Sequence, residues 1–135
     1  MRSANLPEPY WLGRAEVDVI HFAQLREHGG IFGVRDENLL ESAIARPRQK
    51  WTYQPDSDLA ILGAAYAYGL AMNHPWADGN KRAAFVVMAV FCSRNGSRLK
   101  APEAEAVITM LGVAAGKLGE VELASWIRAH LVPVA

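Results

Sequence analysis

Residues 59–73 read LAILGAAYAYGLAMN, residues 74–79 read HPWADG, and residues 80–94 read NKRAAFVVMAVFCSR. The first and third segments are largely apolar and contain no proline, which is typical of helices buried at the centre of a bundle. The second segment holds a proline and a glycine among polar residues, so it predicts a connecting loop. We therefore expect two central helices, over about 57–73 and 80–94.

Apolar spacing and capping residues predict four further helices around this centre. Gly29-Gly30 ends the first of them, while Asp36 caps the second and Pro47 ends it. The sequence thus predicts one all-α domain over residues 1–135, a compact bundle of about six helices. The four outer helices cover about 14–28, 36–47, 102–118 and 121–131.

Residues 46–57, RPRQKWTYQPDS, break the helical pattern. Aromatic and β-branched residues between prolines favour extended backbone, so we predict a short extended flap near 48–55. Trp51, Thr52 and Tyr53 would form its edge, where the backbone of a bound peptide could pair. The alternative is a surface loop tied down by Trp51.

The composition of the chain limits the classes of protein to which it can belong. Hydrophobic residues make up 51% of the 135 residues and charged residues 21%, as in ordinary globular proteins. The single cysteine, Cys92, excludes an internal disulfide and is expected to be an inert core thiol. Residues 1–14 lack the continuous apolar region of a signal peptide, and no apolar run reaches the ~20 residues of a membrane span. We expect a cytoplasmic protein.

The formal net charge is zero, so no overall field favours nucleic acid or membrane. Residues 46–100 nevertheless carry eight basic and three acidic side chains, between two acidic flanks. This pattern either focuses an anionic ligand at one site or is ordinary scatter of surface charge.

The 74–82 segment, HPWADGNKR, carries the residues most suited to chemistry. Polar groups that interrupt a core are costly to bury unless they are paired or bind a ligand. The helix that follows directs its free N–H groups into this loop, and Gly79 lets the backbone approach a ligand closely. Lys81 and Arg82 oppose the helix dipole, which makes sense if an anion binds there. These residues therefore predict an anion-binding site in this loop.

These residues resemble the motif of the Fic/Doc family. The likeness is strongest to its Doc (death-on-curing) branch, the toxins of Phd–Doc toxin–antitoxin systems, whose motif runs His-x-Phe-x-Asp-x-Asn-Lys-Arg. Trp76 stands where the phenylalanine is usual. The resemblance covers about residues 25–96, and further matching segments are 29–36, 39–43, 45–47, Asn73 and Asn95-Gly96.

The resemblance implies a Fic fold and an ATP- and Mg²⁺-dependent transferase. His74 would take the proton from a target hydroxyl, and Asp78 would hold Mg²⁺ at the nucleotide phosphates. The phosphates themselves would be bound by Gly79, Asn80, Lys81 and Arg82. His74 and Asp78 alone are too few protein ligands for tight zinc binding, whereas Mg²⁺ held by one carboxylate and phosphates fits.

Lys81 distinguishes two chemistries within this family. Relatives that transfer AMP usually have glycine there, whereas Doc proteins have lysine and are understood to present the γ-phosphate to a protein hydroxyl. Phe85 stands where many AMP-transferring relatives carry a second arginine. The resemblance therefore implies a protein Ser/Thr kinase acting on a translation protein, elongation factor Tu, and neutralised by a Phd-like antitoxin. The alternatives are a protein AMP transferase and a non-catalytic module that binds nucleotide or a partner.

The remaining histidines, His21, His28 and His130, have no motif around them and are expected to be packing or surface residues. Arg94 and Arg98 either extend a phosphate site or cap the end of their helix, and we favour the cap.

Overall fold

The computed structural model describes residues 7–134, so part of the segment predicted to lack a signal peptide lies outside the described residues. These residues form six helices and a two-stranded antiparallel sheet. The helices are α1 (Arg14–His28), α2 (Glu37–Tyr53), α3 (Leu59–Asn73), α4 (Asn80–Arg94), α5 (Glu103–Ala114) and α6 (Glu120–His130), and the strands are β1 (Ser97–Leu99) and β2 (Leu131–Pro133). The prediction of an all-α bundle is confirmed.

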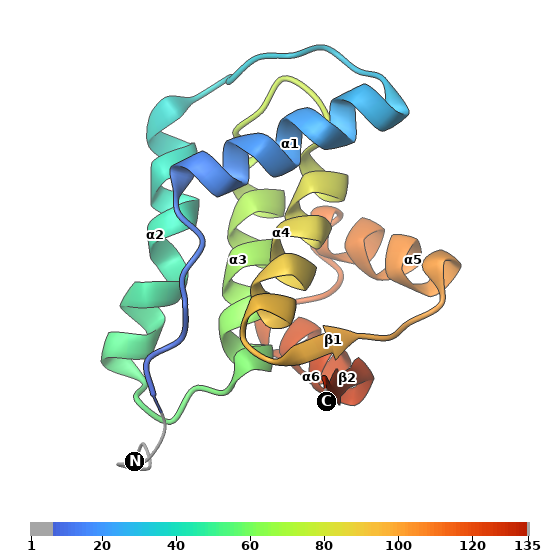
Figure 1. Ribbon diagram of the computed structural model, residues 1–135. Coiled ribbons are helices and arrows are strands. Elements are labelled where there is room, and N and C mark those ends of the chain that lie inside the picture. Colours follow the sequence, from blue (N-terminus) through green and yellow to red (C-terminus); the bar gives the residue numbers. More distant parts are fainter. Residues whose placement is uncertain (1–6, 135) are drawn as a thin grey trace.

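Helix α3 is the centre of the molecule, with α2, α4 and α6 packed around it (Figure 1). Most of its side chains are alanine, glycine or leucine, and ten of its residues are buried, so neighbouring helices approach closely on several sides. Tyr66 is the largest of these buried residues. Its buried hydroxyl accepts the N–H of Leu12 at 2.8 Å and donates to the Leu12 carbonyl at 3.1 Å. The chain before α1 is thereby fixed to the core.

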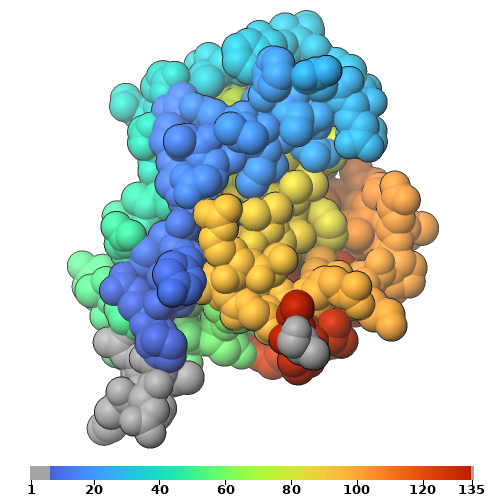
Figure 2. Space-filling model, viewed as in Figure 1, coloured from blue at the N-terminus to red at the C-terminus, as the bar shows by residue number. Residues whose placement is uncertain are grey.

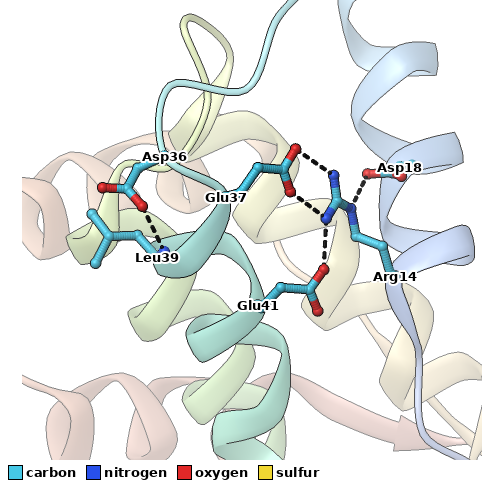
Figure 3. A network of polar contacts seen from close by, with 6 residues as sticks. All are labelled: Arg14, Asp18, Asp36, Glu37, Leu39 and Glu41. Atoms are coloured by element: carbon cyan, nitrogen blue, oxygen red, sulfur yellow. Dashed lines mark hydrogen bonds and ion pairs between the residues drawn. The ribbon is translucent and has the colours of Figure 1, made fainter.

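Helix α1 crosses the end of the bundle at which α3 and α4 are joined (Figure 1). Arg14 on its first turn contacts Asp18, Glu37 and Glu41 at 2.6–2.8 Å, which links α1 to the start of α2 (Figure 3). All four side chains are at least 30% exposed, so the network is expected to set orientation more than stability.

The predicted end of α2 at Pro47 and the predicted flap near 48–55 are wrong. Helix α2 continues through a buried Pro47 to Tyr53, so Trp51, Thr52 and Tyr53 form its last turn. Thr52 donates its hydroxyl to the Arg48 carbonyl at 3.0 Å, and Trp51 packs edge-to-face against Trp11 at 6.2 Å. Tertiary packing of Trp51 thus outweighs the strand propensity of these residues. It also outweighs the cost of Pro47, which removes one helical hydrogen bond and crowds the carbonyl four residues earlier.

The antiparallel pair β1–β2 was not predicted. Its strands are three residues each, too short for an alternating pattern to be visible, and residues 97–99 pair with residues 131–133.

Cys92 is buried as expected, and burial raises the pKa of its thiol to about 12. Among the described residues, no helix has the length and apolarity that crossing a membrane requires.

Candidate functional site

The loop between α3 and α4 begins with a residue in an unusual conformation. His74 has φ 50° and ψ 54°, and it is the one described residue other than glycine with positive φ. Pro75 follows it and disfavours further α-helix at His74. Non-glycine residues adopt this left-handed geometry at a cost of about 1–2 kcal/mol, so the surrounding contacts must hold it.

Those contacts come from the segment between α1 and α2. Arg35 donates from its guanidinium to the carbonyls of His74 and Asn73, at 2.8 and 3.0 Å. The Pro75 carbonyl accepts the N–H groups of Arg35 and Asp36 at 2.7 and 3.1 Å. A cation at the C-terminal end of α3 also complements the helix dipole. Arg35 therefore fixes the backbone from which the His74 imidazole projects.

The middle of the loop is buried and closed by a pair of hydrogen bonds. Trp76 is 1% exposed, and Asn80 accepts its N–H and donates to its carbonyl, both at 2.9 Å. The Asn80 side chain is thus committed to the loop, so its contribution to an anion site would come from its backbone N–H.

Asp78 and Gly79 form the turn that starts α4. Gly79 is left-handed at φ 76°, and it provides no side chain to cap the helix. The exposed Asp78 carboxylate accepts the N–H of Gly79 at 3.0 Å and that of Ile31 at 3.2 Å. The first N–H groups of α4 thus have neither an intrahelical acceptor nor a side-chain cap, as at anion sites.

A cavity of about 450 Å³ lies at this helix start. His74, Asp78, Gly79, Asn80, Lys81 and Arg82, all predicted site residues, line it together. Its other walls come from α1, through Gln24 and His28, and from α5. In Figure 2, blue α1 and orange α5 flank the yellow surface of α4. The far wall is mainly apolar and consists of Phe85, Val86, Ala106, Val107, Met110 and Leu111, with Glu103 beside it.

Trp51, Thr52 and Tyr53 do not line this cavity. Tyr53 is 84% exposed, and the backbone of all three is engaged in helix, so they offer no extended edge for a peptide. This correction follows from the continuation of α2 described above.

Sequence reasoning missed two residues that contact the loop. Arg35 lies in the matching segment 29–36 with no role predicted for it, and the prediction for His21 is a packing or surface residue. His21 is 3% exposed, stacks on Trp76 at 4.2 Å, and has Nε2 2.9 Å from the Asp78 carbonyl. Arg35 and His21 lie 39 and 57 residues before the atoms they bind, so no local pattern could reveal them. His28, also expected to be uninvolved, lines the cavity.

The described residues hold no cluster of three or more His, Cys, Asp or Glu able to bind a metal. One exposed carboxylate beside a helix N-terminus is a poor site for zinc but fits Mg²⁺, which is often held by one or two carboxylates plus substrate phosphates and water. Asp78 is the residue that could hold it, and the backbone of α4 with Lys81 and Arg82 could hold the phosphates.

Comparisons with known proteins identify relatives of this chain. The chain is 29% identical over 113 residues to "Protein kinase doc" of Escherichia phage P1, covering 84% of this chain and 89% of the relative. It is 43% identical over 75 residues to "Toxin Doc" of Mycolicibacterium smegmatis, covering 54% of this chain and 57% of the relative. The profile of the Fic/DOC family matches residues 11–92, which include α1, the 74–79 loop and most of α4. The chain therefore belongs to the Fic/DOC family.

Proposed function

We propose that this protein is a Doc-type toxin that transfers the γ-phosphate of ATP to a serine or threonine hydroxyl of a cytoplasmic translation protein. One observation carries the proposal: a single cavity is lined by a histidine, a carboxylate, two cations and an uncapped helix start. Transfer of a phosphoryl group needs little else from a protein than positioning and electrostatic stabilisation. The relative named "Protein kinase doc" supports this choice of reaction.

In this proposal His74 removes the proton from the attacking hydroxyl. The hydroxyl oxygen forms a bond to the γ-phosphorus, the bond to the bridging oxygen breaks, and ADP leaves. Lys81, Arg82 and the N–H groups of α4 bind the phosphates, and Asp78 holds Mg²⁺. When bound, Mg²⁺ supplies positive charge to the phosphate oxygens. Arg35 keeps His74 directed at the cavity by binding the two carbonyls at the end of α3.

Lys81 and Phe85 support phosphate transfer over AMP transfer. Both residues line the cavity. A lysine side chain occupies space that the β- and γ-phosphates of an AMP donor would need, and its charge suits a single terminal phosphate. Phe85 stands where many AMP-transferring relatives carry a second arginine, so this chain lacks that phosphate-binding side chain.

Substrate and partner follow from the resemblance to the Doc branch. We propose elongation factor Tu as the target and a Phd-like antitoxin as the neutralising partner, in keeping with the relative named "Toxin Doc". Phosphorylation of this factor would stop translation, so expression of the free protein should arrest growth.

The test uses purified protein, Mg²⁺ and a bacterial translation extract, with ATP labelled at either the α- or the γ-phosphate. We expect one protein to be labelled from γ-labelled ATP alone, and mass spectrometry of that band to identify elongation factor Tu. His74→Ala should abolish the label while keeping the melting temperature of the wild type.

Two other results would contradict the proposal. Label from α-labelled ATP would identify an AMP transferase and overturn the argument from Lys81. No transfer of either label by folded protein free of antitoxin would indicate a binding module.

A further inference from the structure

His21 is a buried polar residue that the proposed reaction does not use. It lies on α1, is 3% exposed, and its ring is nearly parallel to that of Trp76, at 7° and 4.2 Å. Its Nε2 is 2.9 Å from the main-chain oxygen of Asp78. Because a carbonyl oxygen only accepts hydrogen bonds, Nε2 carries the proton and donates it.

This bond completes the fixation of Asp78. The residue is held at its main-chain oxygen by His21 and at its two carboxylate oxygens by the N–H groups of Gly79 and Ile31. Only the Gly79 contact is local. The other two come from α1 and from the segment after it, across more than 40 residues of chain.

His21 and its neighbour Leu25 also lie directly beneath the turn at Gly79. A Cβ atom at Gly79 would be 3.2 Å from Leu25 Cδ2 and 3.7 Å from His21 Nε2. Contacts with these two α1 side chains therefore hold the peptide unit that joins Asp78 to Gly79 in its position and orientation. Rotation of that unit would turn the Gly79 N–H away from the Asp78 carboxylate oxygen that accepts it, and so release one of the two hydrogen bonds that hold the carboxylate.

We propose that His21 is a positioning residue, which orients the Asp78 carboxylate for Mg²⁺ by donating Nε2–H to the Asp78 carbonyl. The inference rests on the proposed function, in that Asp78 is taken as the ligand of Mg²⁺. Hydrogen-bond partners of metal ligands typically contribute about 10- to 100-fold to metal affinity or activity.

Two substitutions separate the donor from the ring. His21→Phe keeps a ring to stack on Trp76 but has no N–H, whereas His21→Gln lacks the ring and keeps an amide N–H at a similar reach. We expect His21→Phe to raise the Mg²⁺ concentration for half-maximal transfer about tenfold. At saturating Mg²⁺ the kcat of His21→Phe should stay within about threefold of wild type. In His21→Gln the Mg²⁺ concentration for half-maximal transfer should return most of the way to the wild-type value.

A binding measurement makes the test independent of turnover. Calorimetry with a non-hydrolysable ATP analogue, once with Mn²⁺ and once in EDTA, separates affinity for the metal from affinity for the nucleotide. His21→Phe should weaken binding of the Mn²⁺ complex about tenfold and leave metal-free binding unchanged.

The chain provides a matched control. His130 also lies against a tryptophan, Trp126, with ring centroids 4.5 Å apart and the rings tilted by 33°, and its Nδ1 is 2.7 Å from the Trp126 carbonyl. Its Nε2 is 3.1 Å from a carboxylate oxygen of Glu105. It does not line the cavity. His130→Phe therefore removes a ring-to-carbonyl hydrogen bond together with the contact to Glu105, and we expect it to change the melting temperature without changing Mg²⁺ dependence.

The outcomes distinguish this inference from the proposed function. If wild type and His21→Phe bind the Mn²⁺ complex equally, or if His21→Gln is no better than His21→Phe, the inference is wrong. If the wild type binds the complex and transfers no phosphate, the proposed function fails alone, and the binding data still decide the role of His21. Absence of any binding to the wild type would overturn both.

Discussion

Helices α2 and α3 begin very differently from α4. Asp36 and Asp58 cap the first two, accepting the N–H groups of Leu39 and Ile61 at 3.0 and 2.9 Å. Helix α4 begins at Gly79, which has no capping side chain, and its first turn carries two cations and no acid. An aspartate cap satisfies a free N–H and favours the helix dipole, whereas cations there oppose it.

Two of these helix starts thus have an aspartate cap that stabilises the fold, whereas the third has no side-chain cap and borders a cavity. In each of the first two, an aspartate carboxylate accepts one of the free N–H groups, and the Asp58 carboxylate also binds Arg128 of α6 at 2.7 Å. The third leaves its N–H groups and its charges facing a cavity. Substitutions at the capped helix starts should therefore lower stability and leave activity unchanged, whereas substitutions around the start of α4 should lower activity without lowering stability.

The largest effect is expected at His74. His74→Gly should lower the rate of γ-phosphate transfer about 10²- to 10⁴-fold, because the proposed general base is lost. It should also maintain or raise the free energy of unfolding, by up to about 1 kcal/mol, because glycine adopts positive φ without strain. Transfer assays and urea denaturation measure the two quantities.

His74→Ala is the matched control, since it removes the imidazole and keeps the strained backbone. It should lose the same activity without the gain in stability. A His74→Gly protein that is less stable than His74→Ala would show that the backbone at residue 74 is not strained.

The second effect is the reverse of the first. Asp58→Ala should lower the free energy of unfolding by about 1–2 kcal/mol through loss of the α3 cap. Transfer per folded molecule should be unchanged, because Asp58 does not line the cavity. Arg128→Ala removes the ion pair but keeps the cap, so it should cost less, about 0–1 kcal/mol. Equal losses in the two variants would mean that the cap contributes nothing.

A third prediction concerns how the stability contributed by Asp58 depends on pH. Burial tends to raise the pKa of Asp58, but hydrogen bonds from Arg128 and the Ile61 N–H outweigh it, and the pKa lies below its ordinary value of 3.8. A carboxyl with a lowered pKa in the folded state stabilises the fold above its unfolded pKa, and this contribution disappears as the pH falls through the folded pKa.

Asp58→Asn should therefore be less stable than wild type at neutral pH, and the difference should shrink below about pH 4. Urea denaturation between pH 3 and 7 tests this. A stability difference that stays constant over this range would contradict it.

The smallest effect is expected at Lys81. Lys81→Gln removes a cation from the first turn of α4, so it should raise the free energy of unfolding by about 0.3–1 kcal/mol at low salt. It should also weaken binding of the ATP analogue. Lys117→Gln, at an exposed position after α5, provides the control for loss of one positive charge. A stability gain of the same size in both variants would argue against an effect of the helix dipole.

The sequence predicts the helices and the composition of the site well, because both depend on local patterns. Capping residues, glycines and apolar spacing mark where five of the six helices begin and end to within a few residues. The 74–82 segment contains its chemistry in consecutive residues. The sequence could therefore predict, without knowledge of the neighbouring helices, that the polar residues of this segment line one cavity.

Features that depend on distant partners were not predictable. Trp51 continues a helix because Trp11 packs against it, and β1 forms because β2 pairs with it. His21 and Arg35 contact the loop only after the chain has folded back on itself. In each case the deciding neighbour is more than 30 residues away, where propensity and periodicity carry no information.

The hydrogen bonds between the two loops have a further consequence, for amide hydrogen exchange. The N–H groups of Arg35 and Asp36 bind Pro75, and the N–H of Ala77 binds Gly33 at 2.9 Å. Loop amides usually exchange within the fastest class, but these three should exchange as slowly as amides in the core helices. Their protection factors would report separation of these two loops, which the isolated bridge between Val34 and Trp76 also joins.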